Sequence, residues 1–233
     1  FRLSGLRVRD SAQLTDAQLV DELTSSQLVC LGERHAEAAD AAAFEQLLAS
    51  LLERARFAGR TVSLGLEAFG TANDRALGRY AQGELGRGEL LAKTDYDANW
   101  GYPFAPYERL MARITQQGGE LRGLDAPRSL VEKVAHGGLV SLDRQETAKL
   151  PELELSNLAH RRSFEDAMAA HPHAGRLDDL YAAQVLRGAL FVRAFGGVVV
   201  EDAHGVEMGD HLVARRVALP LEAAVGGVMP FGG

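Results

Sequence analysis

The stretch from Gln27 to His35, which reads Gln-Leu-Val-Cys-Leu-Gly-Glu-Arg-His, decides the fold of this chain. Its first five residues form a short, continuously apolar run, which is typical of a buried strand. The residues that follow have apolar side chains at helical spacing and predict an amphipathic helix over residues 37–57. The spacing is kept by Phe44, Leu47, Leu48, Leu51 and Leu52. A strand, a turn and a helix in this order are the first unit of an α/β protein.

The same alternation continues along the chain. Further strands are predicted at residues 61–66, 120–123, 198–200 and 217–221. Helices are predicted at residues 72–80, at 106–116, from Ala126-Pro127 onward and at 209–216, with a turn at 82–88. The alternation predicts the fold class: α/β, with a largely parallel or mixed sheet that is flanked by helices.

Residues 143–195 have a different pattern, because they contain no strand-like run. Two helical patterns, at 153–170 and 177–195, are joined by the linker His171-Pro172-His173-Ala174-Gly175. We expect this block to be an all-helical insertion or cap within a single domain that spans residues 1–233.

Composition excludes several classes of protein. Of the 233 residues, 46% are hydrophobic and 24% are charged, which is ordinary for a globular protein and rules out a disordered chain. The net charge of −7 argues against nucleic-acid binding, which needs clustered Lys and Arg. The longest apolar runs are far shorter than the roughly 18 residues that span a membrane. The chain begins at Phe1 and not at Met, so we expect an upstream segment.

Carboxylates and histidines follow three of the predicted strands. Glu33 and His35 come directly after the first strand, Glu67 ends the second, and His204 follows the run at 198–200. Ligands of open α/β sheets bind outside the carboxyl ends of the strands, so we expect these four side chains to share one site. Such a cluster suits a divalent metal or general acid/base catalysis.

Structural roles are the alternative for each of these residues. Glu33 could cap a helix, Glu67 could pair with an arginine such as Arg34, and a lone loop histidine such as His204 is usually structural. The chain has no phosphate-binding loop, no Gly-x-Ser-x-Gly motif and no His-Glu-x-x-His motif. Common nucleotide-dependent enzymes and serine hydrolases are therefore disfavoured.

The aromatic residues are concentrated between positions 96 and 107. This segment holds 5 of the 15 aromatic residues of the chain, namely Tyr96, Trp100, Tyr102, Phe104 and Tyr107. An aromatic wall with tyrosine hydroxyls suits a flat apolar ligand, and a phenolate oxygen can coordinate ferric iron. Packing of the core beneath a long loop is the alternative.

Six segments, in order, resemble the domains of the ChaN type. The likeness spans roughly residues 25–220. The segments are 29–35, Leu66-Glu67, Asp97-Ala98-Asn99-Trp100, 123–137, Tyr181-Ala182-Ala183-Gln184 and 203–209. Two regions differ from the usual family pattern: Ala36 and Ala41 stand where polar residues are common, and Gly188, Leu190 and Phe191 follow the late helix segment.

The resemblance implies a fold of the superfamily that also contains the TIKI and TraB proteins and the erythromycin esterase-like enzymes. It implies a haem- or iron-binding protein of the bacterial cell envelope (periplasm or outer membrane), lipid-anchored upstream of residue 1 and active in haem or iron uptake. From this resemblance together with the tyrosine-rich segment, the residues expected to bind the ligand are Tyr102, Tyr107, Trp100, His35 and His204. A homodimer that shares haem between two chains is one option.

A hydrolase is the competing hypothesis. The wider superfamily uses the positions of Glu33, His35, Glu67 and His204 for divalent-metal or acid/base chemistry, so the sequence leaves open whether this protein is an enzyme. A third hypothesis is a degenerate family member whose pocket serves a partner protein, because several polar positions are lost.

Overall fold

The deciding stretch forms the predicted strand and helix, but the strand is not buried: its residues 28–31 are half-buried and Gly32 is exposed. In the computed structural model, Leu28–Gly32 forms strand β3, and after a turn Ala38–Phe57 forms helix α2. The structure describes residues 5–7, 11–26, 28–169, 176–194, 205–208 and 212–217. The continuous apolar run and the helical spacing thus specify the two elements that lead into and out of the predicted site.

The described strands form two sheets. The larger has the order β2-β1-β6-β7-β3, and each of its neighbouring pairs is antiparallel. The smaller consists of the parallel pair β4 and β5. The bounds of these strands are Gly5–Arg7 for β1, Ala12–Leu14 for β2, Leu64–Gly70 for β4, Leu121–Asp125 for β5, Gly205–Met208 for β6 and Leu212–Val217 for β7.

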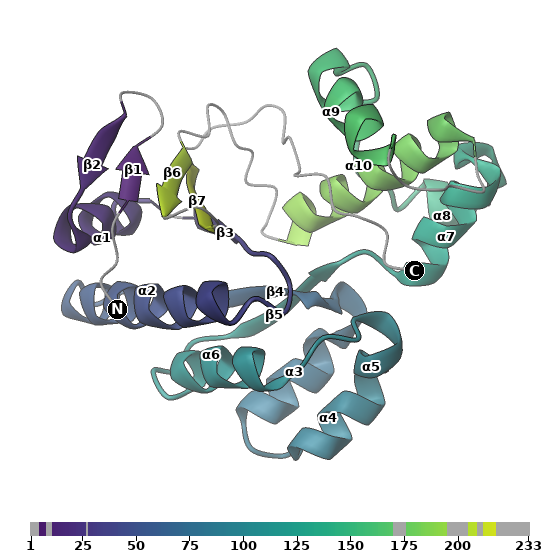
Figure 1. Ribbon diagram of the computed structural model, residues 1–233. Coiled ribbons are helices and arrows are strands. Elements are labelled where there is room, and N and C mark those ends of the chain that lie inside the picture. Colours follow the sequence, from purple (N-terminus) through teal and green to yellow (C-terminus); the bar gives the residue numbers. More distant parts are fainter. Residues whose placement is uncertain are drawn as a thin grey trace.

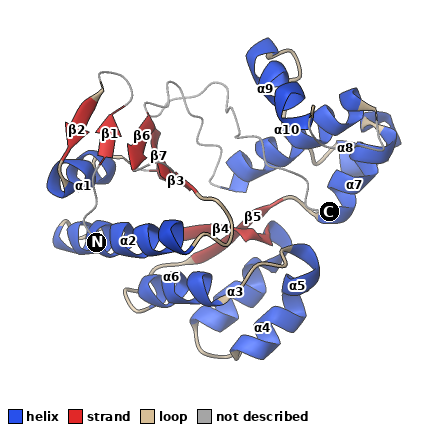
Figure 2. Cartoon of the chain, viewed as in Figure 1, coloured by secondary structure: helices blue, strands red, loops and turns tan. Residues whose placement is uncertain are grey.

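Helices flank the small sheet, and α1 and α2 lie beside the larger one (Figures 1 and 2). Helix α2 packs between α1 and α6, and β5 contacts α3 on one side and α10 on another. The helix bounds are Asp16–Thr24 for α1, Asp74–Ala81 for α3, Arg87–Thr94 for α4, Tyr96–Asn99 for α5, Ala105–Thr115 for α6, Arg128–Gly137 for α7, Arg144–Thr147 for α8, Leu158–Met168 for α9 and Leu177–Ala194 for α10. Short 3-10 turns occupy Thr71–Asn73 (η1) and Leu139–Ser141 (η2).

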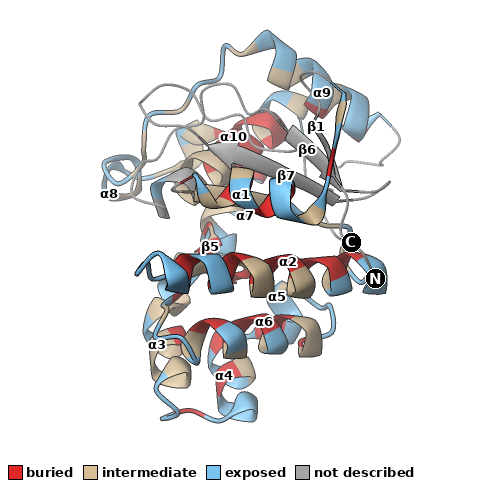
Figure 3. Ribbon diagram, turned by 90° about the vertical axis from the view of Figure 1, so that its left-hand side faces the viewer, coloured by how far each residue is buried: buried red, intermediate tan, exposed pale blue. Residues whose placement is uncertain are grey.

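Buried side chains form two hydrophobic clusters. Figure 3 marks the buried residues on the ribbon, for example along α2, α6 and α10. The first joins α1, α2, α6 and the small sheet, with Leu19, Leu47 and Met111 fully buried. The second joins α7, α9 and α10, with Phe164 and Leu186 fully buried. The helices of residues 143–195 therefore pack together with α7 around a second core.

The predicted fold class is confirmed: the chain is α/β, with a small parallel sheet flanked by helices. The parallel strands are β4 and β5, and they correspond to the strands predicted at residues 61–66 and 120–123. The larger sheet makes the sheet content mixed. The extent of the domain and the status of residues 143–195 as an insertion stay predictions.

One predicted helix is wrong, because the described part of residues 209–216 belongs to strand β7. Residues Leu212–Val217 pair with both β3 and β6, and this double pairing outweighs the helical preference of the segment. Helices α4 and α5 were not predicted, and α4 begins within the predicted turn at 82–88. The predicted strand at 198–200 and most of that at 217–221 lie outside the described residues.

Candidate functional site

Glu33 and His35 lie in the turn that follows β3 and contact each other. Oε1 of Glu33 is 3.1 Å from Nδ1 of His35 and accepts a hydrogen bond of 2.5 Å from the hydroxyl of Tyr107. A carboxylate only accepts hydrogen bonds, so this contact implies that Nδ1 carries the proton. Nε2 has no hydrogen bond to any described residue and is available to a ligand.

Aromatic rings surround the imidazole of His35. The ring centroid of Trp100 lies 4.5 Å away in an edge-on arrangement, and that of Tyr102 lies 4.9 Å away. Trp100 in turn packs edge-on against Tyr107, at 6.1 Å between ring centroids. Tyr102 is 37% exposed and Tyr107 only 8%, so the aromatic wall is open to solvent on the side of Tyr102.

The hydroxyl of Tyr107 is held in its neutral form. Burial raises the pKa of Tyr107, and the hydrogen bond to the Glu33 carboxylate raises this pKa further. Burial also raises the pKa of the neighbouring Tyr96. A protonated phenol donates to Glu33, so in this structure Tyr107 orients the carboxylate and a phenolate at this position is disfavoured.

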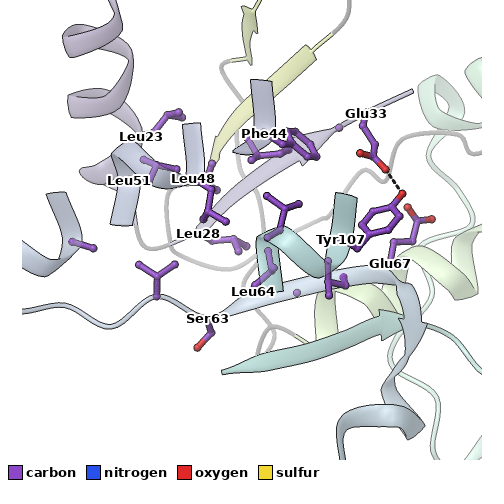
Figure 4. Close-up of a pocket in the computed structure, with 18 of the residues that line it drawn as sticks. Leu23, Leu28, Glu33, Phe44, Leu48, Leu51, Ser63, Leu64, Glu67 and Tyr107 are labelled. Carbon is purple, nitrogen blue, oxygen red and sulfur yellow. Dashed lines mark hydrogen bonds between the residues drawn. The ribbon is translucent and has the colours of Figure 1, made fainter. Parts of the chain in front are cut away.

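Glu67 reaches the same place from β4. Its strand is irregular there: Leu66 pairs with Gly123 and Gly70 with Asp125, so four residue steps on β4 face two on β5. An irregularity of this kind re-aims side chains. It closes tightly on Gly123, where an added Cβ would come within 2.2 Å of the Gly70 carbonyl oxygen. Figure 4 shows Glu33, Tyr107 and Glu67 at one end of a cavity, with the two carboxylates near the ring of the tyrosine.

A partly buried ionic network holds Glu67. Arg187, from α10, lies 3.3 Å from Oε1 of Glu67 and makes two hydrogen bonds to Asp125, of 2.5 and 2.9 Å. Burial raises the pKa of Glu67; the charge of Arg187 opposes this rise, while Asp125 adds to it. The charges of His35 and Glu33 also act on the pKa of Glu67, which places all three groups in one electrostatic environment.

Most of the predicted site residues are therefore brought together. Glu33, His35, Glu67, Trp100 and Tyr107 line one cavity, and Tyr102 packs on His35. His204 lies outside the described residues, and so do His171 and His173. The alternative interpretation of Glu67, a salt bridge to an arginine, is confirmed, but the arginine is Arg187. Arg34, which was the suggested partner, pairs with Glu37 and Asp40.

A metal site is not seen among the described residues, where no group of three or more His, Cys, Asp or Glu side chains is close enough to hold an ion. Since His204 is not among them, the metal set of Glu33, His35, Glu67 and His204 stays a prediction. No helix within the described ranges is long and apolar enough to cross a membrane.

Two residues of the site, Asp125 and Arg187, were not predicted. Asp125 ends strand β5, so the argument that selected Glu67 also applied to it. Arg187 is the single charged residue in the segment Ala182–Val192, which is otherwise apolar apart from Gln184. A lone arginine on a buried helical face needs an acidic partner, and this was the available signal.

The fold and the site together define a class: an α/β protein with a mainly apolar pocket, whose polar end presents a carboxylate-bound histidine and aromatic rings. The family model described as "Haem-binding uptake, Tiki superfamily, ChaN" matches residues 19–194. The chain belongs to this family.

A solved structure supports the same fold. It is described as "Cofacial heme binding to ChaN of Campylobacter jejuni", and it aligns with a TM-score of 0.64 over 81% of this chain and 73% of that one. The two sequences are 14% identical, so the likeness is one of fold. A comparison with curated proteins finds no match.

Proposed function

We propose that this protein binds haem beside His35, with the Nε2 atom of that imidazole as the ligand of the iron. The observation that carries the proposal is the arrangement of the ring: Nδ1 is bound to the Glu33 carboxylate, and Nε2 has no hydrogen bond to any residue in the described ranges. Histidines that ligate metals almost always donate their other nitrogen to a carboxylate, carbonyl or water, which fixes the tautomer and the orientation. Bound haem would supply an iron with axial coordination positions.

The surroundings of His35 fit a porphyrin. Trp100 and Tyr102 provide aromatic surface next to the imidazole, and Tyr102 is exposed enough to meet a ligand that arrives from solvent. Tyr107 donates a hydrogen bond to Glu33, and the Glu33 carboxylate orients the imidazole ring of His35. The lining of the adjoining cavity is mainly apolar, as expected of a site for a flat apolar molecule. The family membership and the Campylobacter jejuni structure support the same ligand.

Titration with ferric haem tests this proposal. Wild-type protein at micromolar concentration should shift the Soret band with saturation near one haem per chain, and His35→Ala should weaken binding by about tenfold or more. Tyr102→Ala should weaken it less, by loss of ring contact. His136→Ala, an exposed histidine on α7, is the matched control and should bind as the wild type does. An unchanged spectrum, or equal affinity for His35→Ala and wild type, would exclude His35 as the ligand.

We propose in addition, from the family, that the protein serves haem or iron uptake at the bacterial cell envelope and carries a lipid anchor upstream of residue 1. Dimer formation is a further proposal, which sedimentation of the protein with and without haem would test. Location would be tested by fractionating cells that produce the full-length protein.

Acid/base hydrolysis is a second candidate function, favoured by the state of Glu67. Burial raises its pKa, while Glu33 beside it is bound to His35 and Tyr107. Two carboxyl groups in unlike environments are the pattern of an acid and a base. Turnover of an activated ester that is lost in both Glu67→Gln and His35→Ala would support this function. Equal rates in the variants and the wild type would rule it out.

A further inference from the structure

A cavity of about 460 Å³ separates β3 from β4. Its walls are apolar and come from three elements: Leu28 on β3, Phe44 and Leu48 on α2, and Leu64 on β4 (Figure 4). The two strands are not hydrogen-bonded to each other, because β3 pairs with β7 and β4 pairs with β5. The space between them is therefore a lined cavity and not the interior of a continuous sheet.

The end of the cavity opposite Glu33 and Glu67 carries the opposite charge. Figure 4 places Ser63 and Leu23 at this end. Arg60 lines it and is held in place by two hydrogen bonds, of 2.7 Å to the carbonyl of Thr24 and 3.2 Å to the carbonyl of Ser26. A guanidinium group has five N–H donors, so three remain for a ligand. Arg60 is exposed, which gives an anion access to it.

A buried hydroxyl beside Arg60 has no partner in the part of the chain that the structure describes. Ser26 lines the cavity and is 7% exposed, and its Oγ is buried without a hydrogen bond to any described residue. Buried polar atoms are nearly always paired, by protein, water or ligand. The hydroxyl of Ser26 and the guanidinium of Arg60 thus form a polar end to a cavity that is otherwise mainly apolar.

We propose that this cavity binds a fatty acid, with the carboxylate at Arg60 and Ser26 and the acyl chain between β3 and β4. The segment from Val62 to Leu66, which runs along the cavity into the start of β4, spans about 13 Å, and this length sets the depth available to the acyl chain. The reverse orientation is disfavoured, because it would bring the carboxylate against Glu33 and Glu67. The head-group site lies at the far end from His35, so the proposal does not rest on haem binding.

Displacement of a fluorescent fatty acid from haem-free protein tests the proposal. Laurate should compete saturably, and dodecanol, which has the same chain without the charge, should compete about tenfold more weakly because charge-assisted hydrogen bonds are lost. Leu48→Trp should abolish binding by filling the chamber. Arg60→Ala should lower laurate affinity to the level of dodecanol, whereas Arg56→Ala, an exposed arginine of α2 outside the cavity, should leave it unchanged.

The comparison of acid with alcohol uses the wild-type protein, so it stands even if a variant fails to fold. The proposal is overturned if laurate shows no saturable competition, if laurate and dodecanol compete equally, or if a folded Leu48→Trp variant binds as the wild type does. None of these readouts involves the Soret band, so failure here is distinct from failure of haem binding.

Discussion

Ala36, the residue after His35, has a φ of 66° and therefore lies in the left-handed region. This conformation costs a residue with a side chain about 1–2 kcal/mol. Neighbouring contacts hold the turn: the buried carboxylate of Asp40 accepts a hydrogen bond of 2.9 Å from the backbone N–H of Arg34, whose side chain also pairs with Asp40. The strain is thus balanced by a buried acid, and both His35 and Glu33 are presented from a turn with a defined shape.

Glu67→Gln should change how stability depends on pH. The pKa of Glu67 in the folded protein is raised above its usual value of 4.5, so above that pH the folded state keeps its proton longer than the unfolded state does. Stability that is present below pH 4.5 is therefore lost as pH rises through the folded pKa, at up to about 1.4 kcal/mol per pH unit. The variant lacks this loss and should gain on the wild type as pH rises.

Urea unfolding at a series of pH values from 4 to 8 measures this difference. Glu152→Gln, at an exposed position on a segment without regular structure, is the control and should follow the wild-type curve. If the difference between Glu67→Gln and the wild type is constant over this range, Glu67 does not titrate abnormally.

The sequence allowed us to predict which residues belong to the site wherever the end of a strand could be recognised. Glu33, His35 and Glu67 each come at or near the end of an apolar run, and this position singled them out. Although their positions at strand ends predict one shared sheet edge, they do not share one, because β3 and β4 belong to different sheets. The partner of Glu67 was not predictable in the same way. Arg187 is 120 residues distant in sequence, and the mostly apolar sequence around it predicts a buried helix but does not identify the acidic residue with which it pairs. Pairing between remote side chains depends on packing that no local pattern encodes.

At the scale of the element, helix α10 joins the site to the second hydrophobic cluster. One part of its surface carries Arg187 toward β4 and β5, and its buried residues, among them Leu186, pack against α7 and α9. Arg187 pairs with two carboxylates, those of Glu67 and Asp125, whose side chains are partly buried. Removing an arginine from such a pair leaves uncompensated charge, which is more harmful than replacing the whole network.

Arg187→Met should therefore destabilise the protein by about 2–3 kcal/mol, less than the value for a fully buried pair because the side chain retains some exposure. Chemical unfolding measures the change. Arg162→Met, on the exposed side of α9, serves as the control and should shift stability by less than about 0.5 kcal/mol. Equal effects of the two substitutions would mean that the network contributes no net stability.

Elements with strong local patterns were predicted well, and those that depend on partners were not. Helix α6 follows the prediction closely because Pro106 lies in its first turn and apolar residues recur on one face. Strand β7 was assigned as a helix, because its segment, Leu-Val-Ala-Arg-Arg-Val, satisfies both patterns over its short length. Pairing with β3, which is distant in sequence, decides between them.

At the scale of the whole molecule, the two hydrophobic clusters should differ in how they open. Phe164 is fully buried in the second cluster, away from the cavity. Phe164→Ala should cost about 3–5 kcal/mol. Amide exchange of this variant and of the wild type, followed by mass spectrometry, should show that the substitution accelerates exchange more in α9 and α10 than in α2 and α6. Equal acceleration in all four helices would show instead that the molecule unfolds as one cooperative unit.

Gly123 can serve as a sequence marker of this site in other proteins. No side chain fits there, because the irregular part of β4 closes over it to present the Glu67 carboxylate. Two sequence features therefore mark this geometry. One is a glycine two residues before an aspartate that ends a strand, as in Gly123 and Asp125. The other is an acidic residue three positions before a glycine that ends a strand, as in Glu67 and Gly70. Relatives too divergent for ordinary alignment can be sorted by it, and those that carry a bulkier residue at the first position must hold their acid by some other means.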